Sequence, residues 1–228
     1  MTALHRHRLV RLRPGAWTML AGAPDNDAAR AALAHWAAHD LPLVVARRHP
    51  GQPASMLRLG LPLPECWGRQ RIGLQVDAGQ VASLVAFASV GEVEPLVAPH
   101  ARLPVRGLHR DLTGLGLQAR VYGSHGWQHL TGLRYLHAAS DLDLLVEVVD
   151  AVSADRAAAL LAGFVPNTPR LDGELVFADG TAVAWREWRD WRAGRVEQLL
   201  LKRIDAVTLA TDAAWLDTAL QRNLAACR

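Results

Sequence analysis

Two carboxylates, Asp141 and Asp143, stand two positions apart at the start of an apolar, strand-like run, SDLDLLVEVV, at residues 140–149. Because side chains alternate between the faces of a strand, both carboxylates lie on one face and close together. Like charges this close disfavour full ionisation of both acids unless a cation lies between them, and Mg²⁺ prefers such hard oxygen ligands. The spacing therefore predicts a magnesium site with Asp141 and Asp143 as ligands.

A glycine-serine pair, Gly123 and Ser124, precedes the two acids at the end of QARVYGS, residues 118–124, which is typical of a strand that runs into a turn. If a helix begins at this turn, its backbone N–H groups and the Ser124 hydroxyl face a phosphate without help from lysine. A metal held by the two carboxylates would contact the same phosphate. The pattern predicts a site for phosphoryl or nucleotidyl transfer, in which metal and positioning supply most of the catalysis.

A third acid is expected nearby, because a hydroxyl acceptor is a poor nucleophile at neutral pH and gains from a general base. Asp172 and Glu174 lie in LDGELVF, the first predicted strand after the Asp-x-Asp strand that offers an acid. Glu187, in the following AWREW, is the alternative. We expect Asp172 or Glu174 to be the base, and the sequence leaves the choice between them open.

Several other side chains near these motifs could contact a substrate. Lys202, at the end of LLLK, could reach the phosphates as a compact cation. Trp127 and Gln128 follow the glycine-serine turn and are expected to bind substrate, with Trp127 either in the core or stacked on an adenine. His125 and His129 have no partner at metal-ligand spacing, so a structural or hydrogen-bonding role is expected for them.

Composition limits the class of protein. The chain has 228 residues, half of them hydrophobic, which is enough for one large core or two small ones. The formal charge is +3, and nearly every cation is arginine. No block of Lys and Arg indicates a nucleic-acid polymer as partner. An acidic carrier protein or a polyphosphate remains open, and Arg186, Arg189 and Arg192 could contact such a carrier.

The ends and the cysteines point to a protein of the cytoplasm. No apolar run reaches the roughly 18 residues needed to span a membrane, and the basic start lacks the apolar centre of a signal peptide. Cys66 and Cys227 show no metal-ligand spacing, so reduced thiols are expected, although a disulfide stays open. We expect a cytoplasmic protein that does not bind membranes.

Hydrophobic patterning predicts an α/β (α+β) fold in two units, with a break near the prolines of residues 91–105. Residues 1–95 would form a small α/β unit that recognises substrate or carrier. Residues 96–228 would form a catalytic domain with a mixed sheet flanked by helices. Helices are expected at 25–39, 106–117, 127–136, 153–164 and 212–228; strands at 41–48, 69–77, 118–124, 140–149, 173–177 and 181–188; a Pro/Gly-rich connection at 49–68; and either element at 81–89 and 196–205.

The order hydrophobic-Gly-Ser, short helix, Asp-x-Asp and later acid resembles the polymerase-beta-like nucleotidyltransferase superfamily. Longer segments, YGSHGWQHLTGLRYLHAASDLDLLVEV, LDGELVFADGTAVAWREW, LLLK and HRHRLVRL, resemble the phosphoribosyl-dephospho-CoA transferases of malonate decarboxylase over nearly the whole chain. The resemblance implies transfer of the 2′-(5″-phosphoribosyl)-3′-dephospho-CoA group to a serine of the decarboxylase's acyl-carrier subunit. The donor would be triphosphoribosyl-dephospho-CoA, the cofactor Mg²⁺, and the released product pyrophosphate.

One position departs from the pattern of that family. We would expect His-Asp after Arg6, whereas this chain has His7 and Arg8, so an N-terminal carboxylate role is in doubt. Two alternatives stay open at this stage. One is the equivalent transferase of citrate lyase, and the other is a binding module that holds Mg-nucleotide without chemistry. The intact Asp-x-Asp favours an enzyme.

Overall fold

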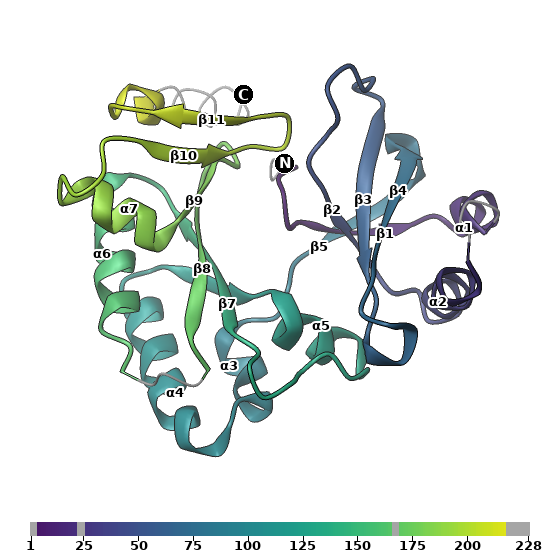
Figure 1. The fold of residues 1–228 in the computed structure, drawn as a ribbon, viewed down its shortest axis with the longest axis horizontal. Helices are drawn as coiled ribbons and strands as arrows, with labels where there is room; N and C mark the ends of the chain where they lie inside the picture. The colour runs from purple at the N-terminus through teal and green to yellow at the C-terminus, as the bar shows by residue number, and fades with distance from the viewer. Residues whose placement is uncertain (1–3, 22–25, 166–168, 218–228) are drawn as a thin grey trace.

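The computed structural model describes residues 4–21, 26–165 and 169–217. It confirms the predicted α/β fold class: two sheets are flanked by helices (Figure 1). The two sheets stand on opposite sides of the molecule, and the segment between β5 and β6 connects them.

The first sheet is antiparallel, with the strand order β4-β3-β2-β1-β5 among the described residues. Helices α1 and α2 lie beside it at the outer side of the molecule (Figure 1). The strands are β1 (Leu9–Leu12), β2 (Leu43–Val45), β3 (Met56–Pro62), β4 (Arg71–Asp77) and β5 (Val81–Val85), and the helices are α1 (Pro14–Leu20), α2 (Asp27–Ala38), η1 (Glu65–Trp67) and η2 (Ala78–Gln80).

The second sheet is mixed, with the order β11-β10-β9-β8-β7-β6 in the same described part of the chain. Strands β7 and β8 are parallel and joined through α6, and the other neighbours are antiparallel. The strands are β6 (Gln118–Val121), β7 (Leu142–Val148), β8 (Leu171–Phe177), β9 (Ala182–Ala184), β10 (Leu199–Lys202) and β11 (Val207–Ala210), and the helices are α3 (Val90–Val93), η3 (Glu94–Leu96), α4 (Pro99–Gly114), α5 (Gly123–Thr131), α6 (Ala151–Ala162) and α7 (Trp185–Arg192).

Two hydrophobic clusters lie on opposite faces of β7. Leu142 and Leu144 belong to the cluster that also contains the buried faces of α4, α6 and α7. Leu145, on the other face, belongs to the cluster built on the first sheet, which also takes in Trp127 and Tyr135. Because this second cluster draws residues from both sheets, burial of apolar surface holds the two halves together.

The connection predicted at 91–105 is mostly helical, since it contains parts of α3 and α4 and all of η3, and it lies between the two sheets along the chain. Pro99 stands in the first turn of α4, where a missing N–H costs nothing, and Val93, Val97 and Val105 are buried. Whether residues 1–95 fold as a separate unit stays a prediction.

Two further segments differ from the prediction in their secondary structure. The Pro/Gly-rich connection at 49–68 contains β3, whose residues alternate between half-buried and buried. The strand predicted at 181–188 ends after β9 and continues as α7, since Trp185, Trp188 and Trp191 repeat every third residue on a helix face.

The remaining elements refine or complete the prediction. The helix predicted at 127–136 begins earlier, as α5, at Gly123. The segments left open at 81–89 and 196–205 contain strands β5 and β10, while β1 and α1 were not predicted. Residues 214–217 are helical, and the rest of the predicted C-terminal helix, with Cys227, lies outside the described residues.

Candidate active site

Three of the predicted acids gather at the start of β7 and β8. Asp143 is the second residue of β7, and its backbone partner in the parallel ladder is Asp172 of β8. Asp141 precedes β7 by one residue. Parallel partners point to the same face of a sheet, so the ladder brings Asp172 beside the Asp-x-Asp pair.

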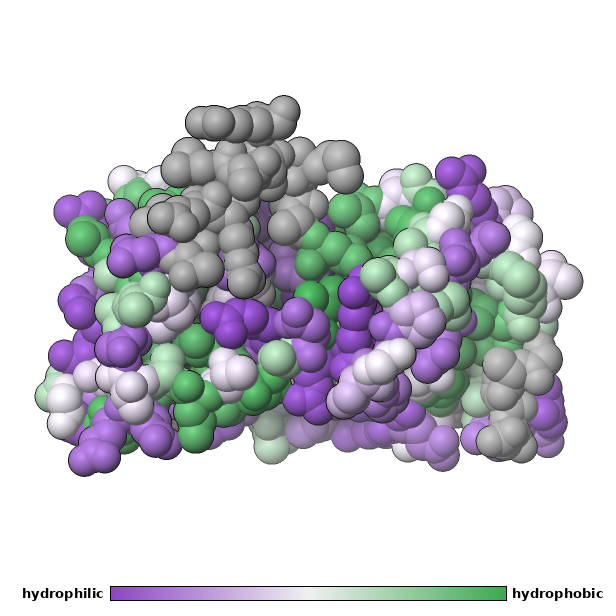
Figure 2. Space-filling model, turned by 90° about the horizontal axis from the view of Figure 1, so that it is seen from above, coloured by the Kyte–Doolittle hydropathy of each residue, from purple (hydrophilic) through white to green (hydrophobic). Residues whose placement is uncertain are grey.

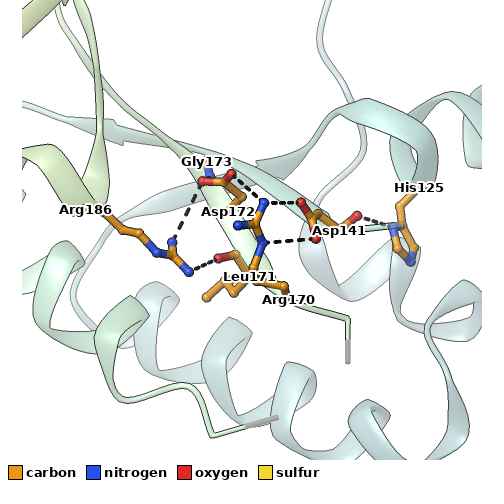
Figure 3. Close-up of polar contacts among 7 residues, drawn as sticks. All are labelled: His125, Asp141, Arg170, Leu171, Asp172, Gly173 and Arg186. Carbon is orange, nitrogen blue, oxygen red and sulfur yellow. Dashed lines mark hydrogen bonds and ion pairs between the residues drawn. The ribbon is translucent and has the colours of Figure 1, made fainter. Parts of the chain in front are cut away.

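An arginine lies among these acids. Arg170 donates from Nε and Nη2 to the two carboxylate oxygens of Asp141, at 3.2 and 2.6 Å, and its Nη2 lies 3.5 Å from Asp172 (Figure 3). Arg186 approaches Asp172 to 3.8 Å from the other side while donating to the Leu171 carbonyl. Arg170 is 62% exposed, so solvent screens this contact.

Asp143 differs from its neighbours because it is largely buried and no salt bridge or side-chain hydrogen bond reaches its carboxylate from the described residues. Burial raises the pKa of Asp143 to about 7, and the negative charges of Asp172 and Asp141 add to the effect. The site therefore holds more negative charge than its own cations compensate.

Gly123 allows α5 to begin against this carboxylate. Its φ is +60°, and a Cβ at this position would overlap the carboxylate of Asp143. The preceding residue, Tyr122, donates its backbone N–H to the Asp143 carbonyl at 3.0 Å. Only glycine permits both the left-handed backbone and the close approach. The predicted glycine-serine turn thus lies directly beside Asp143, with Ser124 as the second residue of α5.

His125 fixes the start of β7 from the same helix. Its side chain is buried, and Nδ1 donates to the Asp141 carbonyl at 2.9 Å (Figure 3). Burial lowers the pKa of His125, which keeps the ring neutral. The predicted hydrogen-bonding role is confirmed for His125, whereas His129 is exposed.

Glu174 lies on the same face of β8, two residues beyond Asp172, but among cations. Lys202 Nζ donates to its Oε1 at 2.9 Å, His7 Nε2 lies 3.4 Å from Oε2, and Arg6 Nη1 lies 3.8 Å from Oε1. Burial opposes its ionisation, but His7, Arg6 and Lys202 outweigh it and lower the pKa of Glu174 to about 2. Lys202, expected to reach the phosphates, is thus engaged by a carboxylate.

Trp127 and Gln128 hold the segment that follows α5. Trp127 is buried, with its ring 5.5 Å from Phe87 and 6.3 Å from Tyr135. Gln128 Oε1 accepts the backbone N–H groups of Tyr135 and Leu136. Both side chains therefore organise the wall of the site. Their contact with substrate stays a prediction.

The remaining predicted residues lie on α7 and in η1. Glu187 is exposed on α7, not on a strand, and does not line the cavity described below. Arg189 pairs with Asp190, and Arg192 pairs with Asp155. Cys66 is an exposed free thiol.

A cavity of about 770 Å³ opens between the two sheets and is lined by Ser124, Asp143 and Glu174, but not by Asp141 or Asp172. Seen from above, hydrophilic residues gather at the middle of the molecule next to hydrophobic ones (Figure 2). From residues 96–228, the cavity is lined by Tyr122, Gly123, Ser124, Trp127, Tyr135, Asp143, Glu174, Leu200, Lys202 and Val207. From residues 1–95, it is lined by Arg6, His7, Val44, Val45, Ala46, Arg47, Gly60, Leu61, Pro62, Arg71 and Phe87.

The sequence predicted a recognition role for residues 1–95 but did not indicate which of them line the cavity. Arg6, His7, Arg47 and Arg71 all line the cavity, yet no local motif marks them. His7 adopts a left-handed backbone, with φ of 64°, which a non-glycine residue rarely does without compensation from its surroundings. Only the segment HRHRLVRL, through the family resemblance, drew attention to this residue.

The expected ligands Asp141 and Asp143 suit a hard cation in their chemistry, and Asp172 lies beside them. Every side-chain donor is a carboxylate oxygen, and the pKa of Asp143 is raised first by burial and then by the negative charges of Asp172 and Asp141. As placed here, the described residues contain no group of three or more His, Cys, Asp or Glu side chains arranged to hold a metal. Arg170 engages both oxygens of Asp141, one of the expected ligands.

Comparison with known proteins identifies the family of the chain. Residues 5–87 match the phosphoribosyl-dephospho-CoA transferase MdcG N-terminal domain, and residues 88–213 match the corresponding C-terminal domain. The chain belongs to the phosphoribosyl-dephospho-CoA transferase family and is a transferase.

Curated relatives agree with this assignment. A phosphoribosyl-dephospho-CoA transferase of Bradyrhizobium diazoefficiens is 41% identical over 209 residues, covering 90% of this chain and 88% of the relative. One of Xanthomonas campestris pv. campestris strain 8004 is 38% identical over 208 residues, covering 90% of this chain and 92% of the relative. No solved structure matches the chain. In the described residues, no helix has the length and apolar character needed to cross a membrane.

Proposed function

We propose that this protein transfers the 2′-(5″-phosphoribosyl)-3′-dephospho-CoA group from its triphosphate donor to a serine of the acyl-carrier subunit of malonate decarboxylase, with release of pyrophosphate. The family supports the type of transfer, and the resemblance described above supports the carrier. The observation that carries the proposal is the Asp143 carboxylate against the start of α5, at the wall of a cavity large enough for an extended nucleotide.

In this proposal Asp141 and Asp143 hold Mg²⁺, which when bound neutralises phosphate charge and polarises the α-phosphorus towards attack. The backbone at Gly123 and the hydroxyl of Ser124 orient the donor's phosphates at the start of α5. His125 keeps Asp141 in place through its carbonyl. Arg170 leaves Asp141 when the cation binds.

Asp172 is the better of the two candidates for the base. It stands opposite Asp143 in the ladder, and 40% of its side chain is exposed and accessible to an acceptor hydroxyl. Glu174, with a pKa of about 2 and a direct bond from Lys202, accepts a proton poorly at neutral pH. We assign the base to Asp172 and a positioning role to Glu174.

The test is pyrophosphate release with purified donor and acyl-carrier subunit, first in excess chelator and then with Mg²⁺ restored. The expected result is release only with the cation, together with a mass increase on the carrier. Full activity in chelator would refute the metal role. Binding of Mg-nucleotide without any release would indicate the non-catalytic module instead.

The choice of carrier is tested by offering the acyl-carrier subunits of malonate decarboxylase and of citrate lyase at equal concentration. Preferential labelling of the malonate decarboxylase subunit is expected. If the citrate lyase subunit is labelled faster, the chemistry stands and the assigned carrier is wrong.

A further inference from the structure

Two arginines of the first sheet line the cavity with no partner of their own. Of the cations on the cavity wall, Arg6 and Lys202 lie within ion-pair distance of Glu174. Arg71, in β4, and Arg47, two residues after β2, are exposed, and their side chains make no hydrogen bond or ion pair with any residue that the structure describes. Their charges are therefore available to an anionic ligand in the cavity.

The part of the cavity wall formed by β2 and β3, called the floor below, is apolar. Val44 of β2 stands opposite Gly60 of β3, and Pro62 stands opposite Arg71 of β4. Gly60 has no side chain, and a Cβ there would lie 3.2 Å from the Val44 side chain, so this part of the floor stays open only with glycine. Such a surface suits a flat ring or an aliphatic arm.

The two ends of the cavity differ in charge. At the second sheet, Asp143 lies beside Asp141 and Asp172, an environment that favours a metal-bound phosphate. At the first sheet, Arg47 and Arg71 favour a phosphate group directly. A ligand with two separate phosphate groups, one held through a metal and one held by arginine, would match both ends.

We propose that Arg47 and Arg71 bind the diphosphate of a dephospho-CoA moiety, and that its adenosine and pantetheine parts lie over the floor formed by Val44, Gly60 and Pro62. This inference rests on the proposed function, because it divides the same donor between the two sheets. In this arrangement the first sheet binds the part of the donor that does not react.

The test uses 3′-dephospho-CoA, which lacks the triphosphoribosyl end, and measures its affinity for the full chain by calorimetry. Arg47→Gln and Arg71→Gln should each weaken binding about tenfold, as expected for a lost charge-assisted hydrogen bond. Arg30→Gln, on the outer helix α2, is the matched control and should bind like the wild type.

Each outcome separates this inference from the proposed function. If the wild type does not bind 3′-dephospho-CoA, or the two arginine variants bind it unchanged, the assignment of Arg47 and Arg71 is wrong even where carrier labelling succeeds. If binding depends on both arginines but no pyrophosphate is released with the carrier, the subsite stands and the proposed transfer fails. ADP, which lacks pantetheine, should show the same dependence on arginine with weaker binding.

Discussion

Asp143 and Glu174 occupy neighbouring strands, share one face of the sheet and are both largely buried, yet their acidities differ in opposite directions. The pKa of Asp143 rises to about 7 because burial and two further carboxylates disfavour its charge. The pKa of Glu174 falls to about 2 because His7, Arg6 and Lys202 outweigh its burial. Burial is common to both sites, so the difference arises from the neighbours.

The difference separates a carboxylate with no ion-pair partner among the described residues, Asp143, from one surrounded by ion-pair partners, Glu174. Glu174 joins the N-terminal segment, through Arg6 and His7, to β10, through Lys202, and so ties one wall of the cavity together. Asp143 makes no such connection and lies free for chemistry. Amide substitutions at the two positions should therefore have opposite effects on stability.

The largest effect is expected for Asp143→Asn. The variant should lose several orders of magnitude in transfer rate, because a metal ligand is gone. The free energy of unfolding at pH 8 should be unchanged or higher, since a carboxyl whose pKa is raised in the folded state destabilises that state when it ionises. Carrier labelling and urea unfolding measure the two quantities. A variant that is both inactive and less stable would show that Asp143 is structural.

Glu174→Gln should have the converse effect on stability. Removing one partner of a buried ionic cluster leaves Lys202 and Arg6 without their counter-charge, so a loss of about 3 kcal/mol in unfolding free energy is expected. Because the folded-state pKa is depressed, this stabilisation is present above pH 4.5 and is lost as the pH falls towards 2. Urea unfolding across this range measures it.

The matched control for Glu174 is Glu147→Gln, an exposed carboxylate on β7, which should leave the unfolding free energy nearly unchanged. If Glu174→Gln is as stable as this control yet transfers no group, Glu174 takes part in the chemistry, and the assignment of the base to Asp172 is wrong.

The same comparison explains what the sequence could predict. Asp141, Asp143, Gly123 and Ser124 were found because their spacing within one strand and one turn is local. The partners of Glu174 come from residues 6, 7 and 202, so no local pattern distinguishes it from Asp172. The register of β7 against β8 determines which acid lies opposite Asp143. The register between two strands separated by a helix cannot be predicted from the sequence of either strand alone.

The first sheet was harder to predict for a related reason. Strand β3 lies among prolines and glycines, which normally mark turns, and it is stabilised by pairing with β4 over its whole length. Similarly, Pro99 and Pro104 suggested a linker, although Pro99 is compatible with the first turn of α4 and Pro104 is accommodated inside the helix. Tertiary contacts overrode the local signal in both places.

A moderate effect is expected for Ser124→Ala. The hydroxyl lines the cavity at the start of α5, beside Asp143, so its loss should raise the KM for the donor about tenfold and leave the KM for the carrier unchanged. Separate saturation curves for the two substrates measure this. Thr113→Ala, at an exposed hydroxyl of α4, is the control. An unchanged donor curve would contradict the assignment of Ser124 to the phosphates.

The smallest effect is expected for Arg170→Gln, which tests whether removing a cation from the acidic cluster increases its affinity for Mg²⁺. Arg170 engages both oxygens of Asp141 and lowers the pKa of Asp143 by its charge, so its removal frees one expected ligand and deepens the charge deficit. Mg²⁺ should bind more tightly in the absence of donor, by no more than about fivefold, because exposed ion pairs are worth at most about 1 kcal/mol. Calorimetric titration with Mg²⁺ measures the change, and Arg189→Gln, whose partner Asp190 lies on α7, serves as the control. If Mg²⁺ binds Arg170→Gln no better than this control, Asp141 is not a ligand, and the negative charge around Asp143 must be met by the donor's own groups or by an arginine.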